Sequence, residues 1–227
     1  MSITRIFLDT SVVKHSFREK RILQSRLEQF EWKGTIHDIE IHDFVTVDPI
    51  SKVDNTRLRT EIECLTEIAR LAREKVIELL FHHETHIEFL SIWSIPNGGQ
   101  PELLQAGVTY VKDPIPYSRL LGPIHHGAHR TRKDLQIEFF KKIEHPRYLE
   151  IQKACGAYQG ASINGNQLID AFHIWCAEAA SATHFLTTDF KLTRLVQQCK
   201  LRRPQVKVVT PTQLLADLNK QRDQVLF

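Results

Sequence analysis

Long apolar runs and paired cysteines are both missing from this chain of 227 residues. No stretch approaches the roughly 20 apolar residues that a membrane span requires, and the N-terminus lacks the apolar run of a signal peptide. The four cysteines are far apart and form no C-x-x-C pair, so neither a zinc knuckle nor a redox motif is indicated. We therefore expect a soluble, cytoplasmic protein in a reducing compartment, with no membrane partner.

Neither sign of charge dominates the sequence. The 30 lysines and arginines exceed the 27 acidic residues by three, and the pI is near 8.7, which permits a nucleic-acid partner without requiring one. Hydrophobic residues make up 42% and charged residues 25%, the values of an ordinary globular protein. We expect residues 1–227 to form a single domain with insertions.

Apolar runs alternate along the chain with segments of helical periodicity. Strands are predicted over 4–9, 76–83, 106–114, 184–189 and 206–209. Helices are predicted over 11–32, 55–75, 84–93, 134–143, 166–180 and 190–199, with a last helix that has Thr210 as N-cap and Pro211 as its first residue. This alternation predicts an α/β fold, in which helices cover both faces of a mostly parallel sheet.

Two segments interrupt this alternation. Residues 33–52 show the alternating pattern of an inserted β-hairpin. Residues 97–147 form the second insertion, which includes a long loop rich in proline and glycine around residues 115–133. Long ordered loops often carry function, so we expect this one to contribute to binding.

Acidic side chains follow two of the predicted strands. Asp9 follows "RIFL" and Asp189 follows "HFLTT", so both carboxylates should emerge at the carboxyl edge of one parallel sheet. Thr10 and Ser11 can hydrogen-bond the first of them. Asp170 and Glu88 lie early in helices that can face the same edge. Clustered carboxylates repel one another unless a cation neutralises them, and Mg²⁺ or Mn²⁺ is the usual solution.

Five pieces of the chain, in this order, resemble the PIN-domain family of metal-dependent nucleases, which includes toxin ribonucleases. They are "IFLDTS", "ETHIEFL", "LIDAFHIWCAEAA", "FLTTDF" and "VKVVTPTQLL". The resemblance implies a PIN-like sheet with Asp9, Glu88, Asp170 and Asp189 as catalytic residues and metal ligands. It also implies a supporting role for Thr187, two positions before the last acid, and we expect His173 to pack beside the ligands.

The resemblance further implies an endoribonuclease that uses Mg²⁺ or Mn²⁺ and acts on RNA rather than DNA. An inhibitory protein partner and a homo-oligomer are both compatible with it. The loop residues Arg130, Arg132 and Lys133 are candidate phosphate contacts, because cationic side chains displace counterions from nucleic acid. The same loop also contains His125, His126 and His129, and it could equally be a plain solvated segment. A zinc site formed by the three histidines is a weaker hypothesis, because no cysteine or acidic residue lies at a suitable spacing from them.

Each acid also has a purely structural interpretation. Asp9 and Asp189 could cap the helices that follow them, and Asp170 could be a solvated acid favoured by the helix dipole. Glu88 could close a capping box with Thr85, in which case Glu84 is the alternate site acid.

Three other classes of protein also fit parts of this pattern. A haloacid dehalogenase-type phosphatase needs a second aspartate where Ser11 stands, and a receiver domain needs an acidic pair near the N-terminus. A PIN-like module that binds RNA or protein without cutting would usually have lost several of the acids. All four acidic positions are retained here, which favours catalysis.

Overall fold

A computed structural model describes residues 3–90, 99–117, 131–157, 164–200 and 203–223. Five strands form one sheet in the order β5-β4-β1-β6-β7, and all neighbouring pairs are parallel. These strands are β1 (Thr4–Leu8), β4 (Ile77–Phe81), β5 (Thr109–Tyr110), β6 (His184–Leu186) and β7 (Lys207–Val209). The predicted α/β fold with a parallel sheet is confirmed.

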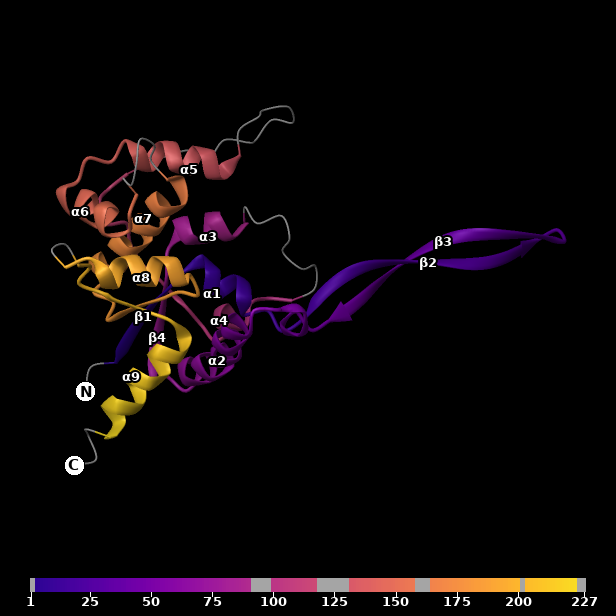
Figure 1. Cartoon of the computed structure of the whole chain (residues 1–227), viewed down its shortest axis with the longest axis horizontal. Coiled ribbons are helices and arrows are strands. Elements are labelled where there is room, and N and C mark those ends of the chain that lie inside the picture. The colour runs from indigo at the N-terminus through magenta and orange to yellow at the C-terminus, as the bar shows by residue number, and fades with distance from the viewer. Residues whose placement is uncertain (1–2, 91–98, 118–130, 158–163, 201–202, 224–227) are drawn as a thin grey trace.

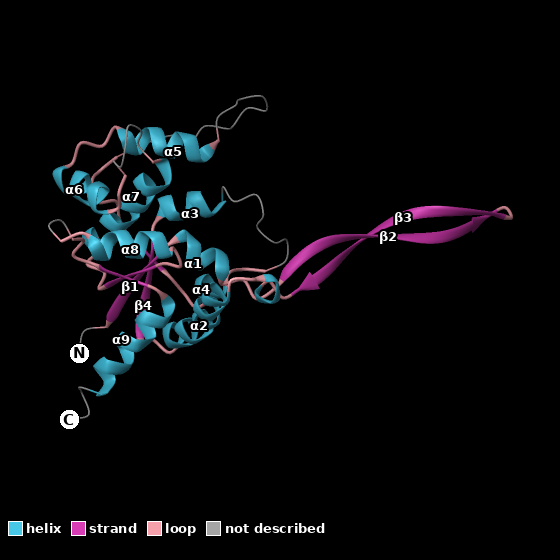
Figure 2. Cartoon of the chain, viewed as in Figure 1, coloured by secondary structure: helices cyan, strands magenta, loops and turns pink. Residues whose placement is uncertain are grey.

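Helices cover both faces of this sheet (Figure 1, Figure 2). They are α1 (Thr10–His15), α2 (Thr56–Arg73), α3 (His83–Leu90), α4 (Glu102–Gln105), α5 (Arg132–Lys141), α6 (Pro146–Ala154), α7 (Gly165–Ala179), α8 (Phe190–Gln198) and α9 (Pro211–Asp223), with a short 3-10 helix over Ile50–Lys52. Side chains of β1 alternate between two cores. Phe7 packs with α5 to α8, whereas Ile6 and Leu8 pack with α1, α2 and α9.

The order of the strands reverses beside β1. From β1 the chain proceeds outward to β4 and β5, then returns to place β6 and β7 on the other side of β1. In open parallel sheets, ligands bind at the carboxyl ends of the strands where the order reverses in this way. The fold therefore places its natural binding crevice at the ends of β1 and β6.

The helix predicted over 11–32 is wrong. Helix α1 ends at His15, and the chain then forms strand β2 (Lys20–Trp32), which pairs antiparallel with β3 (Thr35–Val47). The turn between them has positive φ at both Lys33 (51°) and Gly34 (77°), the geometry of a two-residue hairpin turn that matches the twist of the strands. Pairing along the whole of β3 overrides the helical propensity of this segment, so the hairpin begins well before residue 33.

Other element boundaries also differ from the prediction. The strand predicted over 106–114 is reduced to Thr109–Tyr110, and the predicted insertion over 97–147 includes α4 and α5 and the start of α6. The helix predicted over 84–93 begins one residue earlier and is described only as far as Leu90. Thr210 precedes the last helix as predicted, and its N–H donates to Oε1 of Gln213 (3.1 Å).

The β2–β3 hairpin forms a sheet of its own and projects from the body as a long ribbon (Figure 1). Large apolar side chains on it face solvent, among them Leu27 (75% exposed), Phe44 (65%) and Ile36 (64%). None of these side chains belongs to either core. The ribbon therefore adds little to the stability of the parallel sheet.

Replacing residues 20–47 by a short Gly/Ser linker tests this independence. We expect the unfolding midpoint to stay within about 2 °C of the full-length value, as for changes remote from a core. Circular dichroism with thermal melting measures this. A loss of cooperative unfolding in the shortened chain would show that the hairpin is required for the core.

Candidate active site

Asp9 lies where the strand order reverses. Its backbone N–H donates to the carbonyl of Leu186 (3.0 Å), which fixes the end of β1 against β6. Its Oδ2 accepts hydrogen bonds from the hydroxyls of Ser11 (2.5 Å) and Thr187 (2.7 Å). Asp9 stands at the N-cap position of α1, but its side chain accepts no capping hydrogen bond. The capping interpretation of this carboxylate is therefore wrong, and the hydroxyls orient it instead.

The hydroxyl side chains around Asp9 are themselves held by the backbone. Ser11 Oγ accepts from the N–H of Thr188 (3.0 Å), and Thr187 Oγ1 accepts from the N–H of Asp189 (3.0 Å). The two hydroxyl oxygens lie 3.2 Å apart. Ser11 and Thr187 thus both hydrogen-bond Asp9, and they connect the ends of β1 and β6.

Glu88 faces the same edge from α3. Its Oε2 accepts a hydrogen bond from the hydroxyl of Thr10 (2.6 Å), so Thr10 supports Glu88 and not Asp9. The capping box with Thr85 is wrong, because the helix begins at His83 and places Glu88 in its second turn. The cap is provided by His82, whose Nδ1 accepts from the N–H of Glu84 (3.1 Å).

Glu84, the alternate acid, is buried and engaged elsewhere. Its carboxylate accepts hydrogen bonds from Gln136 Nε2 (2.7 Å) and from the hydroxyl of Tyr117 (3.1 Å). These bonds connect α3 to α5 and to the segment after β5. Glu88 is therefore the acid of α3 that faces Asp9, and Glu84 joins the elements around the site.

His173 lies between two of the predicted ligands. Its Nδ1 is 4.0 Å from Asp9 Oδ1 and 3.9 Å from Glu88 Oε2. The ring is fully buried, and within the described ranges neither ring nitrogen has a hydrogen-bond partner. Burial lowers the pKa of His173 to about 4, against the opposing charges of Asp9 and Glu84, so the imidazole is neutral at pH 7.

Asp170, in the second turn of α7, completes the cluster. Burial raises its pKa well above the ordinary value, and the charges of Asp9, Glu88 and Asp189 raise it further. The pKa of Asp9 is raised by burial and then by Glu88, and that of Glu88 is raised by burial. The structure thus brings the other three predicted acids close enough for their charges to act on Asp170.

Asp189 combines two roles. Its Oδ1 accepts from the N–H of Leu192 (2.9 Å), so the capping interpretation holds for this residue. Its charge nevertheless contributes to the raised pKa of Asp170. A capped helix end and membership of an acidic cluster are compatible, because a carboxylate has two oxygens and several lone pairs.

One of the three predicted phosphate contacts lies near the acids. Lys133, in the first turn of α5, lowers the pKa of both Asp170 and Glu88 through its positive charge. Arg132 is exposed at the first position of the same helix. Arg130 lies outside the described residues, as do His125, His126 and His129.

The donor chemistry of this cluster fits a hard divalent cation. Within the described ranges, no group of three or more His, Cys, Asp or Glu side chains is arranged so that it could hold a metal ion. Burial is the main cause of the raised pKa values of Asp9, Glu88 and Asp170, and neighbouring acids raise those of Asp9 and Asp170 further. Carboxylate oxygens are the ligands that Mg²⁺ and Mn²⁺ prefer, so the chemistry of these three residues and of Asp189, though not their present arrangement, suits such a cation.

The raised pKa values predict that any metal binding by this cluster depends on pH. Because the folded state raises the pKa values of Asp9, Glu88 and Asp170, their neutral forms favour folding. The stability that they contribute is fully present below their ordinary pKa values and is lost as pH rises through the raised values. We expect Mn²⁺ to raise the unfolding midpoint near neutral pH and to have little effect near pH ~4, where the ligands are protonated.

Differential scanning fluorimetry with Mn²⁺ or EDTA across this pH range measures the effect. K⁺ at matched ionic strength controls for general ionic effects. An equal Mn²⁺ shift at both ends of the range would contradict binding by these carboxylates.

Two neighbours of the site were not predicted from the sequence. His82 Nε2 lies 3.0 Å from Asp113 Oδ1, and the His82 ring packs edge-on against Phe172, the residue before His173. Asp113 lies near the end of the strand predicted over 106–114, but β5 ends at Tyr110 and leaves Asp113 in the loop that follows. Because His82 Nδ1 accepts the capping bond, its Nε2 carries the proton and donates to Asp113.

Neither a family model, nor a curated protein, nor a solved structure matches this chain. Among the described helices, none has both the length and the apolar character needed to cross a membrane. The fold and the site define the class: a parallel α/β protein with an acidic cluster at the point where its strand order reverses.

Proposed function

We propose that this protein is a divalent-metal-dependent nuclease of PIN-like architecture that hydrolyses phosphodiester bonds in single-stranded or structured RNA. One observation carries the proposal. Acids from four separate elements converge at the reversal of strand order, where their charges act together on the pKa of Asp170. Such a cluster is costly to fold without a cation, which favours a functional role for it.

The roles of the side chains follow from their surroundings. Asp9, Glu88 and Asp170 would hold Mg²⁺ or Mn²⁺, which supplies charge for the phosphodiester and lowers the pKa of the attacking water. Ser11 and Thr187 fix the orientation of Asp9, and Thr10 fixes that of Glu88. Lys133 adds positive charge beside Glu88 and Asp170, where a phosphate oxygen would approach.

The remaining expectations concern location and partners. The four cysteines are free thiols, which supports the expected reducing, cytoplasmic compartment. An inhibitory protein or a second copy of this chain stays among the proposed partners. The exposed apolar side chains of the β2–β3 hairpin support this, because a partner could cover them.

Cleavage assays test the proposal directly. Purified protein is incubated with labelled single-stranded RNA and DNA, with Mn²⁺ or with EDTA. We expect RNA to be cut only when the metal is present, leaving 5′ phosphate and 3′ hydroxyl ends. Cleavage in EDTA would contradict the mechanism, and RNA binding without cleavage in Mn²⁺ would favour a non-catalytic PIN-like module.

A further inference from the structure

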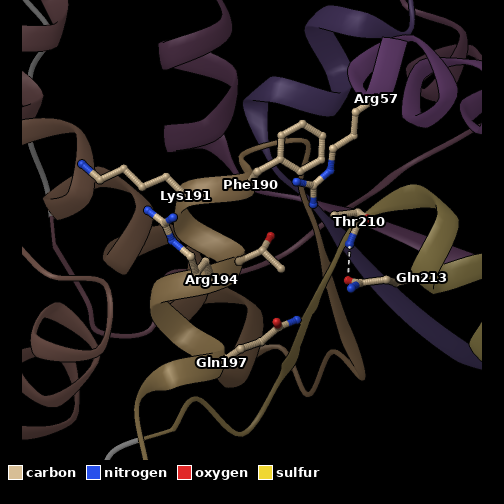
Figure 3. A pocket seen from close by; sticks show the side chains of 8 residues that line it. Arg57, Phe190, Lys191, Arg194, Gln197, Thr210 and Gln213 are labelled. Atoms are coloured by element: carbon tan, nitrogen blue, oxygen red, sulfur yellow. Dashed lines mark hydrogen bonds between the residues drawn. The ribbon is translucent and has the colours of Figure 1, made fainter. Parts of the chain in front are cut away.

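A pocket of about 430 Å³ lies along α8, the helix that begins directly after Asp189 (Figure 3). This volume is within the range of small-molecule binding sites. The pocket is bordered by the start of α2, one face of α8 and the start of α9. Its lining residues are Arg57, Phe190, Lys191, Thr193, Arg194, Gln197, Thr210 and Gln213.

The lining of this pocket carries positive charge alone. It includes Arg57, Lys191 and Arg194 but no acidic residue. All three side chains are exposed, and across the described part of the chain none of them forms an ion pair with a carboxylate. Cationic side chains without carboxylate partners are available to an anionic ligand.

Two of the cations lie on one face of α8, and the third packs against an aromatic ring. Lys191, Arg194 and Gln197 follow one another at intervals of three along α8 and so share one helix face. The guanidinium of Arg57 lies 3.8 Å from the centre of the Phe190 ring. Figure 3 shows the two side chains next to each other. This contact holds the guanidinium plane while its N–H edge stays free for a phosphate oxygen.

The pocket also offers neutral hydrogen-bonding groups. Gln213 Oε1 accepts from the backbone N–H of Thr210, which leaves the amide NH₂ of Gln213 as a donor. Gln197 is exposed on the same face as the cations of α8. Amide groups beside cations suit a ligand that combines phosphate groups with the polar edges of nucleobases and sugars.

The position of the pocket relates it to the acid cluster. Phe190 directly follows Asp189, whose charge acts on Asp170, and Thr210 directly follows β7, the neighbour of β6. The pocket and the cluster therefore lie on the same carboxyl edge of the sheet. A single-stranded nucleic acid that extended from the acids along α8 would meet Arg57, Lys191 and Arg194 in turn.

We infer that this pocket binds phosphate groups of single-stranded nucleic acid next to the bond that is cut. The inference rests on the proposed nuclease function, for which it names a substrate-binding surface. The chemistry that it recognises, a nucleoside phosphate, could also come from a free nucleotide. The binding experiment distinguishes these two sources.

Binding is measured by fluorescence anisotropy with a fluorescein-labelled single-stranded RNA of mixed sequence, in EDTA so that no cleavage occurs. The variants are Arg194→Gln, Lys191→Gln and Arg57→Gln. The control is Lys153→Gln, an exposed lysine on α6 that removes the same charge elsewhere. We expect each pocket variant to weaken binding roughly threefold to tenfold and to reduce the slope of log K against log[KCl] by about 0.7, while the control binds like wild type.

Unchanged affinity and salt slope in all three pocket variants would overturn the inference. Competition assays decide the ligand: AMP that competes as strongly as the RNA would overturn the assignment to a nucleic-acid strand, and so would poly-glutamate that competes equally well. Cleavage in Mn²⁺ is scored separately. Weakened binding without any cleavage would support the pocket and reject the nuclease, whereas normal cleavage and normal binding in the pocket variants would reject only the pocket.

Discussion

Replacing Asp9 by asparagine is expected to reduce metal-dependent RNA cleavage by more than about 100-fold. Removing a residue that only hydrogen-bonds a metal ligand already lowers metal affinity or activity by roughly 10–100-fold. Asparagine has the same shape, and its amide oxygen can still accept the bonds from Ser11 and Thr187. The substitution therefore removes charge and leaves the support intact. Initial rates on labelled RNA in Mn²⁺, together with thermal melting, measure activity and folding in parallel.

The matched control is Asp38→Asn, which removes one negative charge from an exposed position on the hairpin. We expect this variant to cleave RNA at the wild-type rate. Persistence of cleavage in Asp9→Asn at a similar rate would contradict the assignment of Asp9. A loss of activity accompanied by a large fall in melting temperature would instead show that Asp9 acts through folding.

Replacing Asp170 by asparagine is expected to stabilise the metal-free protein. Its carboxyl group has a pKa raised by burial and by three neighbouring acids, so its charge opposes folding at neutral pH. No hydrogen bond to this carboxylate is found within the described ranges, so the amide replaces no bond found there. In EDTA we expect the unfolding midpoint to rise by about 2–8 °C, which corresponds to about 1–2 kcal/mol in a domain of this size.

The same variant should lose cleavage activity, because a neutral amide is a weaker ligand for a hard cation. Stabilisation combined with inactivation is the mark of a residue kept for function at a cost in stability. Melting curves in EDTA and in Mn²⁺ test this. We expect Mn²⁺ to reduce the difference in unfolding midpoint between the variant and the wild type. A destabilised Asp170→Asn protein in EDTA would contradict the electrostatic account.

The parts of the site that could be predicted from sequence are those set by strand ends. Asp9 and Thr187 follow buried apolar runs, and parallel strands bring their carboxyl ends to one edge whatever the helices do. Their hydrogen bond is therefore a consequence of sheet topology. The same rule places Asp189 there, and the structure shows that of the two aspartates considered as helix caps only Asp189 accepts a capping bond.

The parts that could not be predicted depend on partners distant in sequence. Leu23, Leu27 and Phe30 have helical spacing, yet β2 is a strand because β3 supplies its hydrogen bonds. The start of α3 was misplaced because a histidine, His82, caps it in place of the usual serine or aspartate. Arg57 and Arg194 line one pocket from separate helices, and no local pattern relates them.

The central claim is that Asp9, Glu88 and Asp170 together hold a divalent cation. Crystals grown with Mn²⁺ and measured at a wavelength where manganese scatters anomalously test it most directly. The account predicts an anomalous peak within ligand distance, about 2.0–2.4 Å, of carboxylate oxygens from Asp9 and Asp170. A well-ordered site with no such peak, or a peak bound only by other residues, would contradict it.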